Sequence, residues 1–133
     1  MPAHTDDWVL LISSDENHRT SWRSLLNQEG YHVLEAPNAI QALHELRRSP
    51  HALTVLLDHP QLSMLNAIMP DRRVARHHSY LVFCAQDDRC HPRAQALLEQ
   101  LALRVLPYPV AAATLLDAVA HASHNLTAHA LYT

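Results

Sequence analysis

Glycine is almost absent from this chain of 133 residues, with Gly30 as its single copy. Glycine-rich phosphate loops and dinucleotide-binding fingerprints need several glycines, because only glycine lets the backbone approach a phosphate group closely. The sequence therefore excludes both kinds of nucleotide site.

Long hydrophobic runs, strong net charge and a cysteine framework are also missing. No apolar run approaches the roughly 20 residues that a membrane helix needs, and the polar, acidic residues 1–7 do not resemble a signal peptide. The formal net charge of −3 is too mild for a surface that binds nucleic acid strongly. Two cysteines, Cys84 and Cys90, fit neither a disulfide framework nor a zinc ribbon. We expect a cytoplasmic protein that contacts neither a membrane nor nucleic acid directly.

Short apolar runs alternate with longer amphipathic segments along the chain. The runs predict strands at 8–12, 31–35, 53–57, 80–84 and 103–106. The amphipathic segments predict helices at 16–28, 37–48, 62–69, 92–102 and 110–124. This alternation predicts one α/β domain over 8–124, with a parallel sheet covered by helices on both faces. Residues 1–7 are expected to be a flexible N-terminus, and 125–133, which carry no strong pattern, a frayed C-terminal extension.

Polar side chains follow several of the predicted strands. Asp58 ends the most apolar run of the chain, Ala52 to Leu57. In parallel sheets, functional groups gather at the carboxyl ends of the strands. The side chains expected to meet there are Ser13, Ser14, Asp58, Cys84 and Tyr108.

The order and spacing of these segments resemble the receiver domain of two-component response regulators over roughly residues 8–123. The matching segments are VLLISSD at 9–15 with Arg19 after it, EGYHV at 29–33, AIQAL at 39–43, VLLD at 55–58, LVFCAQDD at 81–88 and LPYP at 106–109. The resemblance implies a flavodoxin-like fold, a doubly wound (βα)5 domain with a parallel five-stranded sheet.

The resemblance also implies a role for each residue at the strand ends. Asp58 falls on the phosphoacceptor aspartate, Ser13 and Ser14 on the acidic pair that helps to hold Mg²⁺, Cys84 on the threonine or serine that senses the phosphoryl group, Tyr108 on the lysine that pairs with it, and Pro109 on the proline after that lysine, which is usually cis. The chain keeps the acceptor and departs from the pattern at the acidic pair, the sensing residue and the lysine.

These departures remove most of the charge that phosphoryl transfer uses. Mg²⁺ prefers carboxylate and water oxygens, and Asp15 lies too far along the chain to replace the missing acidic pair. A tyrosine donates one hydrogen bond but carries no positive charge. Mg²⁺ binding is therefore expected to be weak or absent, and we expect neither a metal site nor a catalytic one.

The preferred interpretation is a stand-alone, atypical receiver that docks onto a kinase, a transcription factor or another receiver without being phosphorylated. The docking face is expected on the last two helices, because the segment 110–124 is apolar on more than one side; a homodimer could use the same face. One alternative is a working single-domain response regulator, phosphorylated on Asp58 by a histidine kinase. Another is a small-ligand or redox sensor that uses Asp58, Cys84 and Tyr108. The chain could also be part of a larger regulator.

Twelve histidines add further candidates. His77 and His78 follow Arg72, Arg73 and Arg76, a basic stretch that fits either a contact with phosphate or an acidic partner, or a solvated loop. His121 and His124 share one helix face and could bind a transition metal if a third ligand joined them, but none is evident.

Overall fold

Five parallel strands form the centre of the molecule in a computed structural model that describes residues 7–49, 52–58, 78–85, 104–108 and 110–132. The strands are β1 (Trp8–Ile12), β2 (His32–Ala36), β3 (Leu53–Asp58), β4 (Ser79–Ala85) and β5 (Arg104–Tyr108). Their order in the sheet is β2-β1-β3-β4-β5, and every neighbouring pair is parallel. The order reverses direction after β2, as the doubly wound prediction requires.

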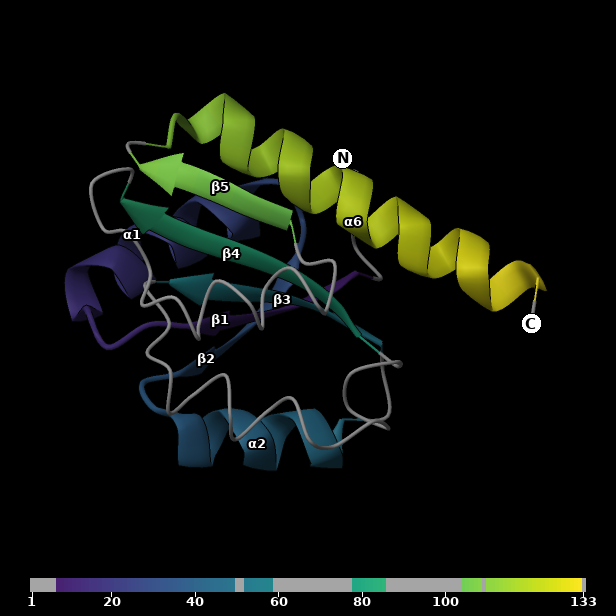
Figure 1. Cartoon of the computed structure of the whole chain (residues 1–133), viewed down its shortest axis with the longest axis horizontal. Helices are drawn as coiled ribbons and strands as arrows, with labels where there is room; N and C mark the ends of the chain where they lie inside the picture. Colours follow the sequence, from purple (N-terminus) through teal and green to yellow (C-terminus); the bar gives the residue numbers. More distant parts are fainter. Residues whose placement is uncertain (1–6, 50–51, 59–77, 86–103, 109, 133) are drawn as a thin grey trace.

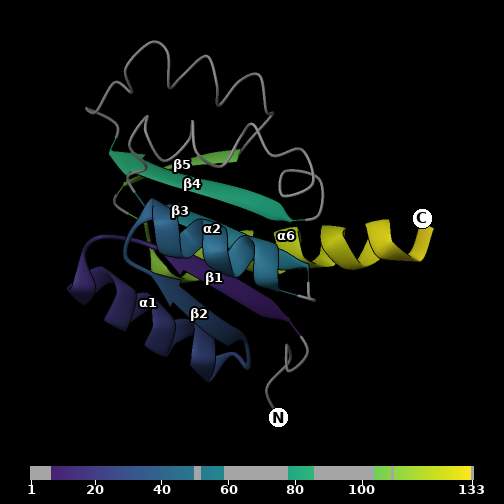
Figure 2. The same cartoon turned by 90° about the horizontal axis from the view of Figure 1, so that it is seen from below.

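Helices cover both faces of this sheet (Figures 1 and 2). Helices α1 (Glu16–Gln28) and α6 (Ala112–Tyr132) pack on one face, and α2 (Ala39–Arg48) packs on the other. The side chains of β1 alternate between the two layers: Val9 and Leu11 join the α1 and α6 layer, whereas Leu10 and Ile12 join the α2 layer. All four are buried, which explains why the strand reads as a continuous apolar run.

The boundary between α1 and β2 lies one residue later than the sequence predicted. Tyr31 was expected to begin the strand, but its N–H donates to the carbonyl of Leu26, and the N–H of Gly30 donates to that of Asn27. Tyr31 therefore belongs to the turn that ends α1. Gly30 has a φ of 94°, a conformation that glycine adopts without steric cost.

The other strands and the last helix also differ from their expected bounds. Strand β3 includes Asp58, β4 is one residue longer at each end, and β5 runs through Tyr108, because each gains backbone pairing with its neighbour. Helix α6 begins at Ala112 and continues to Tyr132, where we expected an irregular extension after His124. The final segment contains neither glycine nor proline, so nothing in its composition ends a helix. Figure 1 shows this part of α6 reaching past the edge of the sheet.

Some predictions lie outside the described residues. They are the flexible residues 1–6, the helices expected at 62–69 and 92–102, and the proline at 109. The domain boundaries at 8 and 124 stay predictions.

Candidate functional site

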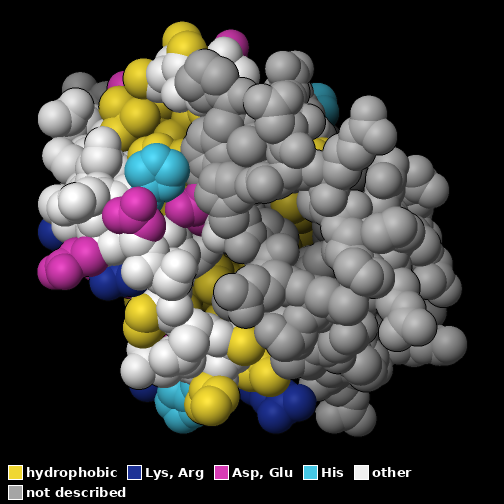
Figure 3. Space-filling model, turned by 60° about the vertical axis from the view of Figure 1, so that its left-hand side comes forward, with side chains coloured by type: hydrophobic (Ala, Val, Ile, Leu, Met, Phe, Trp, Pro, Cys, Tyr) yellow, Lys and Arg dark blue, Asp and Glu magenta, His cyan; other side chains and the backbone are white. Residues whose placement is uncertain are grey.

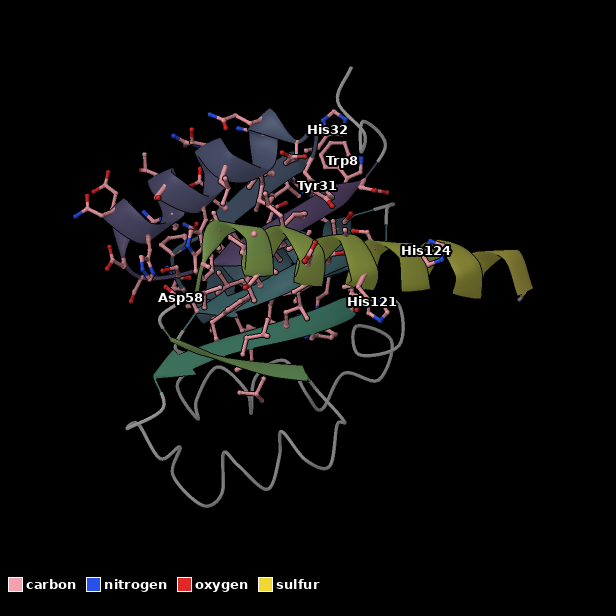
Figure 4. All side chains as sticks on the ribbon, turned by 90° about the horizontal axis from the view of Figure 1, so that it is seen from above. Trp8, Tyr31, His32, Asp58, His121 and His124 are labelled. Carbon is pink, nitrogen blue, oxygen red and sulfur yellow. The ribbon has the colours of Figure 1, made fainter. Side chains whose placement is uncertain are left out.

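The carboxyl ends of the strands bring together the residues that the sequence singled out. Ile12 pairs with Leu57, so the next residues along the two strands, Ser13 and Asp58, stand side by side. Asp58 in turn pairs with Phe83. Figure 4 shows Asp58 at one end of the sheet and Trp8, Tyr31 and His32 at the other.

Ser13 binds the carboxylate of Asp58 directly. Its hydroxyl donates to Asp58 Oδ2 over 2.7 Å, and its oxygen accepts the N–H of Asp15 over 3.1 Å. Ser13 and Asp58 are both buried, with 2% and 9% of their whole-residue surface exposed. A hydroxyl has one hydrogen to donate, so Ser13 is committed to Asp58.

His18 is the second partner of Asp58, and the sequence analysis missed it. Its Nδ1 lies 2.9 Å from Asp58 Oδ2. An ionised carboxylate only accepts, so Nδ1 carries the hydrogen, and the contact becomes an ion pair when the ring is protonated. The side chain of His18 is 38% exposed and that of Asp58 only 3%. We name Asp58, Ser13 and His18 the acceptor site, after the position that the resemblance gives Asp58.

The start of α1 places His18 there. Asp15 is the N-cap of the helix, and its Oδ1 accepts the N–H of His18 over 3.1 Å. A residue three positions after an N-cap lies in the first turn, beside the strand end that leads into the helix. The N-cap signal was legible in the sequence; the direction of the His18 ring was not.

The other carboxylate oxygen, Asp58 Oδ1, is buried and has no hydrogen-bond partner among the described residues. A buried polar atom without a partner is costly and is often functional. The whole chain contains no lysine that could pair with it.

The residues present do not fit a Mg²⁺ ion. Ser14 is exposed and neutral, Ser13 is committed to Asp58, and the carboxylate of Asp15 caps α1. Within the described ranges, no group of three or more histidine, cysteine, aspartate or glutamate side chains could hold a metal ion. Among the residues that the structure describes, Asp58 would face a hard cation as a single carboxylate, which is a poor site.

The order of the three groups also argues against acyl transfer. In a serine nucleophile site, a histidine stands between the serine and the carboxylate and takes the serine proton. Here the carboxylate stands between Ser13 and His18, both of which bind the same oxygen. Ser13 is therefore not activated by an imidazole.

The imidazole of His18 packs on a pair of aromatic rings. Its ring stacks on Trp22 with a centroid distance of 5.2 Å, and Trp22 meets Phe83 edge to face at 4.9 Å. Phe83 is the residue that pairs with Asp58 on β4. The contacts thus link the acceptor carboxylate, the first helix and the core in one connected set.

Arg19 fixes the strand end beside this set. Its Nη1 donates to the carbonyl of Ser13 over 2.6 Å, and its Nε lies 3.7 Å from Glu35 Oε1. Arg23 donates to the other oxygen of Glu35 over 2.8 Å. The charge of Arg19 is therefore directed at Glu35 and the backbone.

Figure 3, which brings the strand ends forward, shows a histidine beside acidic side chains at the surface.

Two other predicted site residues have described backbones only. Cys84 and Tyr108 lie on β4 and β5 at the same edge as Asp58, since Ala85 pairs with Tyr108, but their side chains are not among those described. A sensing or redox role for Cys84 stays a prediction.

Of the other histidine candidates, one is buried and two are exposed. His78 is buried, so the prediction of a solvated loop or a phosphate contact is wrong for it: its Nδ1 accepts the N–H of Leu53 over 2.9 Å, and its Nε2 lies 3.2 Å from the carbonyl of Leu46. His121 and His124 are exposed along α6 (Figure 4), and no third ligand joins them in the described part of the chain.

The comparisons with known proteins show the fold. No protein-family model matches the chain, and no curated protein sequence matches it. A CheY-like receiver domain from Methanospirillum hungatei is 17% identical with a TM-score of 0.78, covering 91% of this chain and 97% of its own. The receiver domain of a LuxO repressor protein from Vibrio parahaemolyticus is 18% identical with a TM-score of 0.78, covering 95% and 96%.

A third structure, named as an adenylate cyclase from Rhodopirellula baltica, is 15% identical with a TM-score of 0.80 and covers 95% of this chain and 93% of its own. Its name describes that protein, and nothing in the described site of this chain points to catalysis. The likenesses cover nearly the whole chain at low identity, and they confirm the flavodoxin-like prediction. The chain has the fold of the CheY-like receiver domains of response regulators.

Proposed function

We propose that this chain works in signal transduction as a receiver-like domain that binds protein partners without phosphorylation of Asp58. The observation that carries the proposal is the state of the acceptor carboxylate. Its side chain is 3% exposed, and Ser13 and His18 already bind its Oδ2.

Phosphoryl transfer to an aspartate needs a free carboxylate oxygen in line with the donor and cations around the transferred group. The acceptor site offers Oδ1 alone, in a buried position. The acidic pair and the lysine of the receiver pattern are replaced by serines and a tyrosine. These facts support a domain whose chemistry has been lost while its fold, and with it the surface for docking, has been kept.

The docking surface belongs to the same proposal. Helix α6 leaves residues 112–114 exposed at its start, while Leu115, Ala118 and Val119 pack on the sheet. The other helix of the expected face, 92–102, lies outside the described residues. Partners of the expected kind are a kinase, a transcription factor or another receiver.

Within the described residues, no helix is long and apolar enough to span a membrane.

Acetyl phosphate with millimolar Mg²⁺ tests the proposal. We expect the intact mass of the protein to stay unchanged, and beryllium fluoride with Mg²⁺ to leave the amide NMR signals of Ser13, Asp58 and Phe83 in place. An Asp58→Asn variant is the matched control, because it keeps the shape and loses the acceptor. An adduct that forms on the wild type and disappears in Asp58→Asn would overturn the proposal.

The second candidate is a working regulator phosphorylated on Asp58, and the partnerless Oδ1 is the observation that favours it. The same experiment decides between the two. The docking surface is tested separately by comparing the proteins that co-purify with the wild type, with Asp58→Asn and with Ala113→Arg. We expect Asp58→Asn to retain the wild-type partners, and Ala113→Arg, which places a charge on the exposed start of α6, to lose them.

A further inference from the structure

We propose that His18 blocks the acceptor site from within the protein: its imidazole occupies the position at Asp58 that a metal cation would have to take. The proposal rests on the proposed function and names the residue that keeps Asp58 unreactive. Neither the resemblance nor the comparisons give position 18 a role.

The two contacts of Asp58 Oδ2 leave it no direction for a cation. Oδ2 accepts from both Ser13 and His18, at 2.7 Å and 2.9 Å, which uses the two lone-pair directions of a carboxylate oxygen. A cation could then reach Asp58 only through Oδ1, which is buried. Removal of His18 frees one direction on Oδ2, whereas Ser13 stays in place, held by the N–H of Asp15.

His18 lies between Asp58 and the solvent. His18 is the member of the acceptor site that reaches solvent, at 38% exposed against 3% for Asp58. The contact pair therefore runs from a buried oxygen to the surface. A side chain on the first turn of a helix can be shortened without moving the backbone, so a substitution of His18 should open the site while the fold stays intact.

Two neighbours hold the ring of His18 in place. Stacking on Trp22 at 5.2 Å fixes the plane of the imidazole, and the N-cap bond from Asp15 fixes its backbone. Aromatic stacking of this kind adds to the hydrogen bond, since both constrain the same ring. His18 is thus positioned by contacts on two sides and presents Nδ1 to Asp58.

A double-mutant cycle on Mn²⁺ binding tests this role. Because one carboxylate binds a divalent cation weakly, Ser14→Asp supplies a second one at an exposed position next to Ser13. The free Mn²⁺ is measured by electron paramagnetic resonance for the wild type, Ser14→Asp, His18→Ala and the double variant. We expect the double variant to bind Mn²⁺ roughly tenfold to a hundredfold more tightly than Ser14→Asp, the range that one charge-assisted hydrogen bond is worth.

The location of the ion decides whether the binding is relevant, since a chain with twelve histidines offers other weak sites. Paramagnetic broadening of the amide signals should centre on Ser13 and Asp58. Asn17→Ala in the Ser14→Asp background is the matched control; Asn17 is the exposed neighbour of His18 on α1, and its removal should leave Mn²⁺ binding unchanged. His18→Asn serves if His18→Ala does not fold, and it should tighten binding by less, because its amide can still donate to Asp58.

Equal Mn²⁺ affinities with and without His18, or broadening centred away from Asp58, would overturn the role of His18 and leave the proposed function standing. Phosphorylation of the wild type on Asp58 by acetyl phosphate would instead overturn the proposed function. The two results are read from different proteins and different signals, so one failure cannot be mistaken for the other.

Discussion

Histidine has three different roles in the described part of this chain, set by what surrounds each ring. His18 binds the acceptor carboxylate, His32 stacks on Trp8 with a centroid distance of 4.6 Å, and His78 holds two backbone segments together. His78 accepts at Nδ1 from a backbone N–H, so its hydrogen lies on Nε2, which donates to the carbonyl of Leu46. The ring is therefore neutral in the folded protein.

Replacing His78 by phenylalanine should destabilise the protein by about 2–4 kcal/mol, because the N–H of Leu53 and the carbonyl of Leu46 would lose a partner inside the protein. Urea denaturation measures the loss. His44→Phe is the control, since His44 is exposed on α2. Equal effects of the two substitutions would show that the bonds of His78 contribute little.

Tyr31 gives a prediction for alkaline pH. Burial, with the negative charges of Asp7 and Glu29 adding to it, raises the pKa of Tyr31 from 10.0 to about 12. Between these values the unfolded chain loses the tyrosine proton and the folded chain keeps it, so the free energy of unfolding falls as the pH rises. The loss should reach on the order of 2 kcal/mol by the upper end of the window. Tyr31→Phe should show a flatter profile in urea denaturation above pH 10, and identical profiles would contradict the assignment.

At the scale of elements, the first turn of α1 serves the helix and the acceptor site at once. Asp15 caps the helix through the N–H of His18, and Ser13 joins the same turn through the N–H of Asp15. The three consecutive helix-start residues therefore differ in role. Ser13 binds Asp58, Ser14 is exposed, and Asp15 caps α1.

Asp15→Ala should therefore have two effects. The loss of the cap should cost about 1 kcal/mol in urea denaturation, and the amide of His18 should exchange its hydrogen faster, because its acceptor is gone. Asp15→Asn keeps an oxygen in the capping position and should preserve most of the protection. Unchanged exchange in Asp15→Ala would show that another group holds the first turn.

Helix α6 is longer than its amphipathic pattern predicts. The buried positions Leu115, Ala118, Val119, Ala122 and Ser123 repeat at helical spacing. Ser123 also lies 3.0 Å from Thr54 through their hydroxyl oxygens, a buried polar link between α6 and β3. The amphipathic pattern stops near this point, whereas the helix continues to Tyr132, because helix propensity without a breaker is enough to extend a helix that is already packed.

At the scale of the molecule, the sheet separates two hydrophobic clusters, one under α2 and one under α1 and α6. The acceptor site lies at the edge of this sheet, where β1, β3 and the start of α1 meet. Its parts come from segments 45 residues apart for Ser13 and Asp58. The state of the site should therefore affect the stability of the whole domain.

Thermal unfolding with and without millimolar Mg²⁺ tests the site on this scale. A ligand that binds only the folded state raises Tm in proportion to the logarithm of its concentration above Kd. We expect no change in Tm at the Mg²⁺ concentrations that saturate a metal-binding receiver domain. Ser14→Asp with His18→Ala is the comparison, in which Mg²⁺ should raise Tm. A rise in the wild type would show that the serines and Asp58 form a metal site after all.

The sequence by itself determined the class of fold, an α/β domain with a parallel sheet. Continuous apolar runs require strands buried on both faces, and their alternation with amphipathic segments requires a parallel sheet between helix layers. It also placed Asp58 and Ser13 at one edge, since parallel strands end on the same side. These features follow from short-range patterns, whereas the ends of several strands and of α6 did not follow from them.

Only the tertiary structure decided what Asp58 contacts. Whether the ring of His18 turns to Asp58 or to solvent depends on how α1 packs on β1 and β3, with Trp22 and Phe83 beneath it. The same holds for His78, whose two backbone partners come from α2 and β3. Side-chain direction is set by neighbours that lie far away along the chain, so residue spacing could name the acceptor carboxylate but not the histidine that binds it.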